Sequence, residues 1–388
     1  MTGEQHIRNT TIKVRLYPTP AQAELFEKTF GCCRWLWNQM LADQEKFYAE
    51  TDVHFLPTPA KYKKGAPFLK EVDSGALATV HQNLRKAFQH FFDSPQAYRH
   101  PTYKRKKSGR ASYTIYCQRY SAGKGANIYL TKSGVRLPKA GEVKAKLHRR
   151  PLHWWTLKTA TVSRTLTGKY FCSLTFSYPV KVLPPVLPTA ETTLGLNYSL
   201  AHFYVDSQGK RADPARWLAA SRNKLAKIQR RMARMQPGSR NYRHQLRKLR
   251  RLHEHLANQR KDFLHQESRR LANTWDAICV RQPDLLALSQ SLHQGSINVM
   301  DAGYSRFLLF LAYKLECQGK SLLTVKKTFP SAKLCHQCGA VYDDLPAEAR
   351  QWICPSCGAH LDRARNGAEN LRDQGLAQFY DNHSTGAA

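Results

Sequence analysis

Four cysteines near the C-terminal end form two Cys-x-x-Cys pairs, Cys335 with Cys338 and Cys354 with Cys357, separated by 15 residues. Each pair makes a tight turn that presents two thiolates, and a glycine follows each pair where such a turn needs a positive φ. Four thiolates at this spacing predict a tetrahedral Zn²⁺ site without an open coordination position, so this zinc would be structural. The alternative is a set of four unrelated buried thiols, and the spacing disfavours it.

The other six cysteines lie in apolar contexts and are interpreted as core residues: Cys32, Cys33, Cys117, Cys172, Cys279 and Cys317. The N-terminal residues lack the basic and apolar regions of a signal peptide, and no stretch approaches the ~20 apolar residues of a membrane span. We therefore expect a cytoplasmic protein, in a reducing compartment where paired cysteines bind metal more often than they form disulfides.

The net charge of the chain points to a polyanionic partner. In 388 residues, 61 Lys and Arg oppose 28 Asp and Glu, for a net charge of +33, while 42% hydrophobic content is enough to form cores. An acidic metabolite would need only one local basic pocket, whereas here the charge is spread over almost the whole chain. Nucleic acid is therefore the favoured class of partner.

The densest basic segment is 221–275, which holds 16 Lys and Arg against 3 acidic residues. Its helical pattern is interrupted at Pro237-Gly238-Ser239, which predicts two antiparallel helices. Charged helix faces that are merely solvated usually mix both signs, so the one-sided excess favours phosphate contact. The predicted phosphate-binding residues are Arg230, Arg231, Arg234, Arg243, Arg247, Lys248 and Arg251.

The first half of the chain predicts a strand at 11–16, a helix that begins at Thr19-Pro20, and a helix at 74–92. Short strands follow up to Pro184-Pro185, at 112–117, 127–131, 142–148, 158–165 and 169–177. The second half predicts a strand at 193–205 that returns after a Gly-Lys turn, and a buried strand at 277–281. A helix at 301–318 with Asp301 as its N-cap, a strand at 321–326 and a helix at 366–380 complete the pattern.

Several of these segments, in this order, resemble the TnpB family, the transposon-encoded ancestors of type V CRISPR effectors. The resemblance is carried by Thr11–Gln22 with Arg34 and Asn38, Asn258–Asp262, Asp301–Ser305, Lys314, and the cysteine pairs with the preceding Lys333. The resemblance covers nearly the full length of the chain and implies a bacterial, nucleoid-associated protein. It implies an α+β multidomain fold with a β-barrel wedge domain, a helical recognition insertion, a split RNase H-like RuvC domain and a zinc ribbon.

The domain boundaries that the resemblance implies are 1–18 and 106–190 for the wedge, 19–105 for the recognition insertion, 191–330 for RuvC, 331–358 for the ribbon and 359–388 for the rest of RuvC. It also implies a guide RNA, with one protein chain per guide, and double-stranded DNA read through a short adjacent motif and guide pairing. The residues expected to contact the DNA motif, from the helical recognition region, are Tyr48, Lys70, Thr79, Gln82 and Lys86. Thr79, Gln82 and Lys86 recur at helical spacing, and an ordinary solvated helix face explains this spacing equally well.

The sequence departs from the family at the three carboxylates that hold two Mg²⁺ ions in RuvC nucleases. The family's Gly-Ile-Asp-Leu-Gly strand is here Gly195-Leu-Asn-Tyr-Ser199, which places Asn197 at the aspartate. The glutamate that ends the next strand is replaced by Arg281. In the last segment, Asp362-Arg-Ala-Arg-Asn-Gly-Ala368, Ala364 replaces the final aspartate.

Three losses to three different residue types indicate natural inactivation, while intact cysteines and basic helices indicate retention for binding. Five other acids in the domain are candidate substitutes: Asp206, Asp276, Asp284, Asp301 and Asp362. The pattern resembles nuclease-dead TnpB-like repressors (TldR), which implies an RNA-guided DNA-binding protein that blocks RNA polymerase without catalytic Mg²⁺. Two alternatives stay open: an active nuclease with displaced carboxylates, and an RNA-binding protein without a DNA target.

Overall fold

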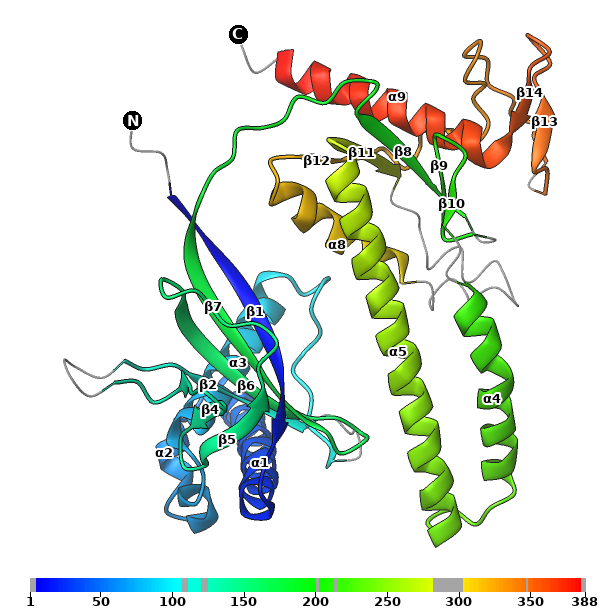
Figure 1. Cartoon of the computed structure of the whole chain (residues 1–388). Helices are drawn as coiled ribbons and strands as arrows, with labels where there is room; N and C mark the ends of the chain where they lie inside the picture. The colour runs from blue at the N-terminus through cyan, green and yellow to red at the C-terminus, as the bar shows by residue number, and fades with distance from the viewer. Residues whose placement is uncertain are drawn as a thin grey trace. The chain divides into compact units, whose positions relative to one another are not determined.

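The computed structural model describes residues 5–106, 111–119, 125–199, 202–212, 215–281, 303–346 and 348–384. The chain divides into two compact units, Met1–Lys181 and Val182–Ala388, which are described separately (Figure 1). Within the described residues, no helix is long and apolar enough to cross a membrane.

The first unit is built on a seven-stranded antiparallel sheet in the order β2-β6-β7-β1-β5-β4-β3. The strands are β1 (Gln5–Tyr17), β2 (Ala111–Tyr116), β3 (Tyr129–Leu130), β4 (Gly134–Leu137), β5 (Gly141–Lys146), β6 (Thr156–Arg164) and β7 (Tyr170–Lys181). An Arg119–Ala126 bridge and the side-chain hydrogen bonds of Asn127 to Gln118 and Tyr116 link the segments next to β2 and β3. These contacts bring the two ends of the sheet together, as expected for a barrel-like wedge.

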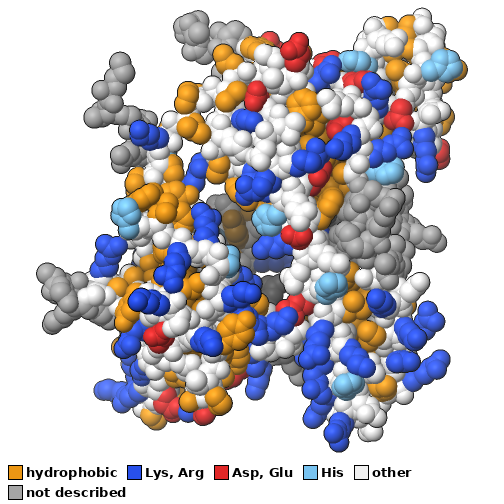
Figure 2. Space-filling model, viewed as in Figure 1, with side chains coloured by type: hydrophobic (Ala, Val, Ile, Leu, Met, Phe, Trp, Pro, Cys, Tyr) orange, Lys and Arg blue, Asp and Glu red, His pale blue; other side chains and the backbone are white. Residues whose placement is uncertain are grey.

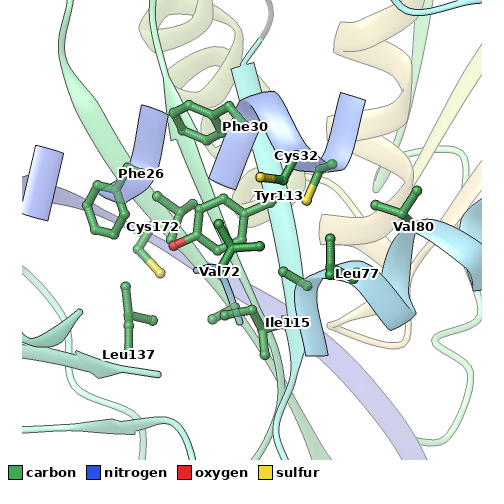
Figure 3. Packing of buried hydrophobic residues seen from close by; sticks show 14 of the residues in the cluster. Phe26, Phe30, Cys32, Val72, Leu77, Val80, Tyr113, Ile115, Leu137 and Cys172 are labelled. Atoms are coloured by element: carbon green, nitrogen blue, oxygen red, sulfur yellow. The ribbon is translucent and has the colours of Figure 1, made fainter. Parts of the chain in front are cut away.

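Helices α1 (Pro20–Thr51), α2 (Pro59–Tyr62) and α3 (Ser74–Asp93), with the 3₁₀ turn η1 (Pro67–Lys70), complete this unit. The predicted helix start is confirmed, since Thr19 caps α1 through a reciprocal capping box with Gln22. Apolar residues of α1, α3 and the sheet share one core, in which Phe26 and Phe30 lie against Tyr113 (Figure 3). Burial raises the pKa of the Tyr113 phenol far above its usual range, so the ring stays neutral in this core.

The second unit has a five-stranded sheet in the order β10-β9-β8-β11-β12. Its strands are β8 (Thr193–Tyr198), β9 (Tyr204–Asp206), β10 (Arg211–Ala212), β11 (Ala277–Arg281) and β12 (Ser321–Val325). Strands β8, β11 and β12 are parallel, and β9 and β10 return antiparallel. The single strand expected at 193–205 is therefore wrong, because the chain turns between Tyr198 and Tyr204.

Among the described residues, four helices accompany this sheet: the basic pair α4 (Ala215–Ala233) and α5 (Arg240–Thr274), and the helices α8 (Tyr304–Glu316) and α9 (Arg363–Ser384). Helix α9 crosses β8 so closely that a Cβ on Gly195 would lie 1.8 Å from the carbonyl oxygen of Ala368. Only glycine permits this approach, which places the first turn of α9 beside the end of β8. On the other face, α8 and the C-terminal half of α5 contribute Phe307, Leu311 and Leu271 to the core.

The break predicted in the basic segment is confirmed, because α4 ends at Ala233 and Ser239 caps the start of α5. The predicted cap of α8 is wrong. Asp301 lies outside the described residues, and the helix begins at Tyr304 with Gly303 as its N-cap, in the left-handed region at φ 69°. The cysteine-containing segment folds into the hairpin of β13 (Gln351–Ile353) and β14 (His360–Asp362), which leads directly into α9.

Candidate functional site

The four predicted ligand cysteines form one cluster. Their sulfur atoms all lie within 4.8 Å of one another, with Cys335 Sγ 3.7 Å from Cys357 Sγ and Cys338 Sγ 3.6 Å from Cys354 Sγ. A tetrahedral ion with metal–sulfur bonds of ~2.3 Å has sulfur–sulfur edges of about 3.8 Å, so the cluster fits such an ion. Hydrogen bonds from the backbone N–H of Cys357 lower the pKa of the Cys354 thiol to about 6, which favours the thiolate form that metals bind.

Two asparagines of α9 hold the segment around the first cysteine pair, residues 331–336. Asn366 accepts a hydrogen bond from the backbone N–H of His336 at 2.9 Å and donates to the carbonyl of Leu334 at 2.7 Å. Asn370 donates to the carbonyls of Ser331 and Leu334. The cluster therefore fixes the start of α9, which is also the element that carries Ala364.

The structure brings Asn197, Arg281 and Ala364 to one edge of the second sheet. Val280 pairs with Leu196 in parallel strands. The residues that follow them, Arg281 and Asn197, are therefore level with each other. A Cβ on Gly195 would meet the carbonyl of Ala368, and a Cβ on Gly375 would meet the sulfur of Cys279, so residues 195 and 279 both face α9. Side chains alternate along a strand, so Asn197 and Arg281, each two residues further on, lie on this same face. The Asn197 side-chain Nδ2 donates to the carbonyl of Ala364 at 3.1 Å.

Arg281 is half-buried, and its Nη1 donates to the carbonyl of Phe329 at 3.2 Å. No acidic side chain pairs with it among the residues that the structure describes. A cation at this position repels Mg²⁺ by several kcal/mol at ~4 Å, even with an effective dielectric near 20. A two-metal site requires carboxylate oxygens, and none is supplied by the Asn197 amide, the Arg281 guanidinium or the Ala364 methyl group.

The described acids of this unit do not converge at that edge. Oδ1 of Asp362 accepts from the backbone N–H groups of Ala364 and Arg365 at 3.0 and 2.9 Å, and Oδ2 contacts Arg211 at 3.4 Å, so this carboxylate caps α9. Asp276 pairs with Lys320 at the opposite end of β11. Asp284 and Asp301 lie outside the described residues.

Asp206 is buried in the turn between β9 and β10. Its Oδ1 accepts from the backbone N–H groups of Gln208 and Lys210 at 3.1 and 2.8 Å. Burial raises its pKa above the usual range. Across the described residues, the cysteine cluster is the single group of three or more potential ligands with metal-binding geometry.

The predicted phosphate-binding residues all lie on the hairpin of α4 and α5. All seven side chains are exposed, and none pairs with an acid among the described residues: Arg230, Arg231, Arg234, Arg243, Arg247, Lys248 and Arg251. Figure 2 shows Lys and Arg side chains gathered over this hairpin with few acids between them. Apolar residues of both helices, among them Ile228 and Leu249, are half-buried, so the cations are not needed to hold the pair together.

The residues expected to contact the DNA motif differ in their exposure to solvent. Gln82 and Lys86 are exposed on α3, but Thr79 is 3% exposed and its hydroxyl donates to the carbonyl of Gly75. Lys70 is exposed at the end of η1, and Tyr48 stacks on His54 with ring centroids 4.3 Å apart. A groove-reading face on α3 would therefore consist of Gln82 and Lys86 without Thr79.

Sequence reasoning missed a cavity of about 520 Å³ in the first unit, between α1, α3 and β2. Thr79 lies in its wall, and the polar side chains that line it include Arg34, Asn83, Lys104, Ser112 and Thr114. Asn38 holds the basic segment that contains Lys104 against α1, through two hydrogen bonds to the backbone of Lys104. Only the basic and aromatic composition of residues 98–107 could have indicated this cavity from the sequence.

Comparison with known proteins identifies the family. A relative from Streptomyces pristinaespiralis named "Putative RNA-guided DNA endonuclease" is 32% identical over 94% of this chain and 89% of its own length. The chain belongs to the TnpB (IS605 OrfB) family. A second relative, "Putative RNA-guided DNA endonuclease InsQ" of Escherichia coli K12, is 26% identical over 95% of this chain and 93% of its own.

Family models of TnpB proteins match three segments. They are "Probable transposase" at residues 177–288, "Helix-turn-helix domain" at 8–52 and "Cas12f1-like, TNB domain" at 304–371. Residues 8–52 form most of β1 and one continuous helix in this chain. A solved structure titled "Cryo-EM structure of the Cas12f1-sgRNA-target DNA complex" has a TM-score of 0.60 and 12% identity over 94% of this chain and 99% of its own. This TnpB-family chain thus has a Cas12f-like fold with a RuvC-like domain and a zinc-ribbon-type module.

Proposed function

We propose that this TnpB-family protein binds a guide RNA and a matching DNA duplex without cutting it, and represses transcription by blocking RNA polymerase. The observation that carries the proposal is the edge of the RuvC-like sheet, where Asn197, Arg281 and Ala364 meet. Nuclease chemistry at such an edge uses carboxylate-bound Mg²⁺, and these three side chains do not fit that ion.

Support for RNA-guided binding comes from the relatives and from the basic surfaces. Two relatives that match nearly the whole chain carry the words "RNA-guided DNA endonuclease" in their names, and the solved structure of similar fold is a complex with guide RNA and target DNA. The exposed cations of the α4–α5 hairpin give this protein a surface for the phosphates of a guide–target duplex.

The remaining parts take roles within the same proposal. We place the contacts to the short DNA motif at the cavity of the first unit, whose wall includes Arg34, Asn83 and Thr114. Gln82 and Lys86 lie on α3, the helix that carries Asn83. The cysteine cluster would hold a structural Zn²⁺ that keeps the hairpin folded and fastened to α9. The polar lining of the cavity supports the first assignment, and the four clustered thiolates support the second.

The experiment is recovery and sequencing of the RNA that purifies with the protein, followed by binding to a DNA duplex that matches it. We expect RNAs with a constant part and a variable 3′ guide, and tight binding only to the matched duplex. Recovered RNA without a guide that matches genomic DNA, or equal binding to unmatched duplex, would contradict the proposal. The first of these results would favour an RNA-binding protein without a DNA target.

A further inference from the structure

Strand register and sequence order place three cations at or just beyond the carboxyl ends of β11 and β12. Arg281 pairs in register with Val325, and Lys326 and Lys327 follow Val325 directly. The backbone N–H of Phe329 donates to the carbonyl of Lys326 at 3.1 Å, and the carbonyl of Phe329 accepts from Arg281. The turn that carries both lysines is therefore fastened to the guanidinium of Arg281.

These cations have spare capacity for an anion. Only Nη1 of Arg281 has a recorded partner among the described residues, and none of its other nitrogen atoms is sealed from solvent. Lys326 and Lys327 are exposed, and neither pairs with an acid in the described part of the chain. Asp362, which precedes α9, is already engaged by the first turn of α9 and by Arg211, and Asp373 of α9 pairs with His336 and Arg372.

The position in the fold suits a ligand. In α/β sheets with parallel strands, ligands bind outside the carboxyl ends of the strands. Here β8, β11 and β12 are parallel and end together at this edge, beside the start of α9 (Figure 1). A guanidinium with free donors recognises phosphate oxygens through paired, charge-assisted hydrogen bonds, and lysines add point charges.

We propose that Arg281, with Lys326 and Lys327, binds a backbone phosphodiester of a single DNA strand at the edge where a nuclease of this fold holds metal ions. The inference rests on the proposed function, since that function brings DNA to this domain. No bond forms or breaks, and no metal is needed. The replacement of a carboxylate by Arg281 would thus hold the strand as well as prevent its cleavage.

DNA is favoured over RNA as the strand. The two full-length relatives are named DNA endonucleases, and the edge that carries Arg281 lies within the family segment at residues 177–288 and beside the segment at 304–371. A single RNA strand is the competing ligand, and it enters the test as a separate arm.

The test uses the protein with its bound RNA, a single DNA strand of about 20 nucleotides, and buffers with EDTA at several salt concentrations. Arg281→Gln removes the charge but keeps an amide that can donate to Phe329. Arg350→Gln is the matched control, because Arg350 is exposed just before β13 and its side chain has no recorded partner among the described residues. We expect Arg281→Gln to weaken binding about tenfold and to lower the log–log salt slope by about 1. Equal affinities and slopes for the two variants would overturn the proposal.

A second measurement locates the contact. Single phosphates of the strand are replaced in turn by neutral methylphosphonates. The wild-type protein should lose affinity at one or two adjacent positions, and Arg281→Gln should not respond there. A uniform response in both proteins, or an equal effect of Arg281→Gln on single-stranded RNA and on DNA, would contradict a DNA phosphate site. Because the strand is unrelated to the guide, failure here is distinct from failure of guide-matched binding, which a comparison of matched and unmatched duplexes reports.

Discussion

The side-chain amide of Asn197 donates a hydrogen bond to the backbone carbonyl of Ala364, across the contact between β8 and α9. An aspartate at position 197 would be an acceptor and would face that carbonyl without a donor. The amide therefore joins β8 to the start of α9, and residues 197 and 364 form a structural contact.

Asn197→Asp should therefore destabilise the RuvC-like unit rather than restore a nuclease. The carboxylate loses the hydrogen bond and lies beside a carbonyl oxygen, which should lower the free energy of unfolding by about 1–3 kcal/mol. Urea unfolding measures this change. The control is Asn258→Asp on the exposed face of α5, which should change stability by less than about 0.5 kcal/mol. A stabilised Asn197→Asp protein would contradict a structural role for this amide.

Lys314 gives a pH-dependent prediction. Its side chain is 6% exposed, and its Nζ donates to the carbonyl of His265 and to the hydroxyl of Ser268, both neutral groups on α5. Burial, with a smaller contribution from the charge of Arg269, lowers the pKa of this ammonium from 10.5 to about 8. Between pH 8 and 10.5 the unfolded chain binds more protons than the folded one, so stability at this site rises with pH.

The difference in unfolding free energy between wild type and Lys314→Met should therefore change by roughly 2–3 kcal/mol in favour of wild type from pH 8 to pH 10.5. Urea unfolding at four pH values measures it. Lys224→Met, on the exposed face of α4, should show a constant difference over the same range. A constant difference for Lys314→Met as well would mean that this lysine is not titrating in the folded protein.

The cysteine cluster predicts one tightly held Zn²⁺ per chain. Cys335→Ser should release the metal and expose the backbone amides of β13, β14 and the start of α9 to hydrogen exchange, because the hairpin has few other apolar contacts. Elemental analysis and exchange measurements check both effects. Cys317→Ser, at the end of α8, should keep the zinc. Unchanged metal content in Cys335→Ser would exclude the four-thiolate assignment.

Salt dependence tests the basic hairpin. Changing Arg243, Arg247 and Arg251 to glutamine should lower the log–log salt slope of nucleic-acid binding by about 1 for each lost phosphate contact. The matched variant with lysine at the same three positions keeps the charges and should keep the slope. If the glutamine and lysine variants bind with the same slope, these side chains are solvated and do not contact phosphate.

The sequence predicts correctly those helix ends and turns that are determined by residues only a few positions apart. The capping box at Thr19, the helix break before Ser239 and the two cysteine turns are of this kind. β4, a four-residue strand, was missed because so short a segment has no readable period. Thr79 shares helical spacing with Gln82 and Lys86, but packing against the first unit's core decided that it is buried.

The candidate site needed tertiary information. The sequence indicated three replaced carboxylates through family resemblance, but not that Asn197 bonds to Ala364, or that Arg281 holds the turn after β12. Those contacts depend on strand register and on the close approach of α9 at Gly195. The approach of α9 joins residues more than 150 positions apart. The same holds for Asp362, whose role as the cap of α9 is visible only in the fold.

The most direct test of the account is an assay of the protein–RNA complex with a guide-matched DNA duplex in Mg²⁺ and in Mn²⁺, in which binding and strand integrity are measured on the same sample. The E. coli relative InsQ, 26% identical, serves as the comparison in the same assay with its own guide. We predict stable guide-dependent binding with both DNA strands intact in either metal. Sustained guide-dependent cleavage that stops on chelation would contradict the account and would favour displaced carboxylates.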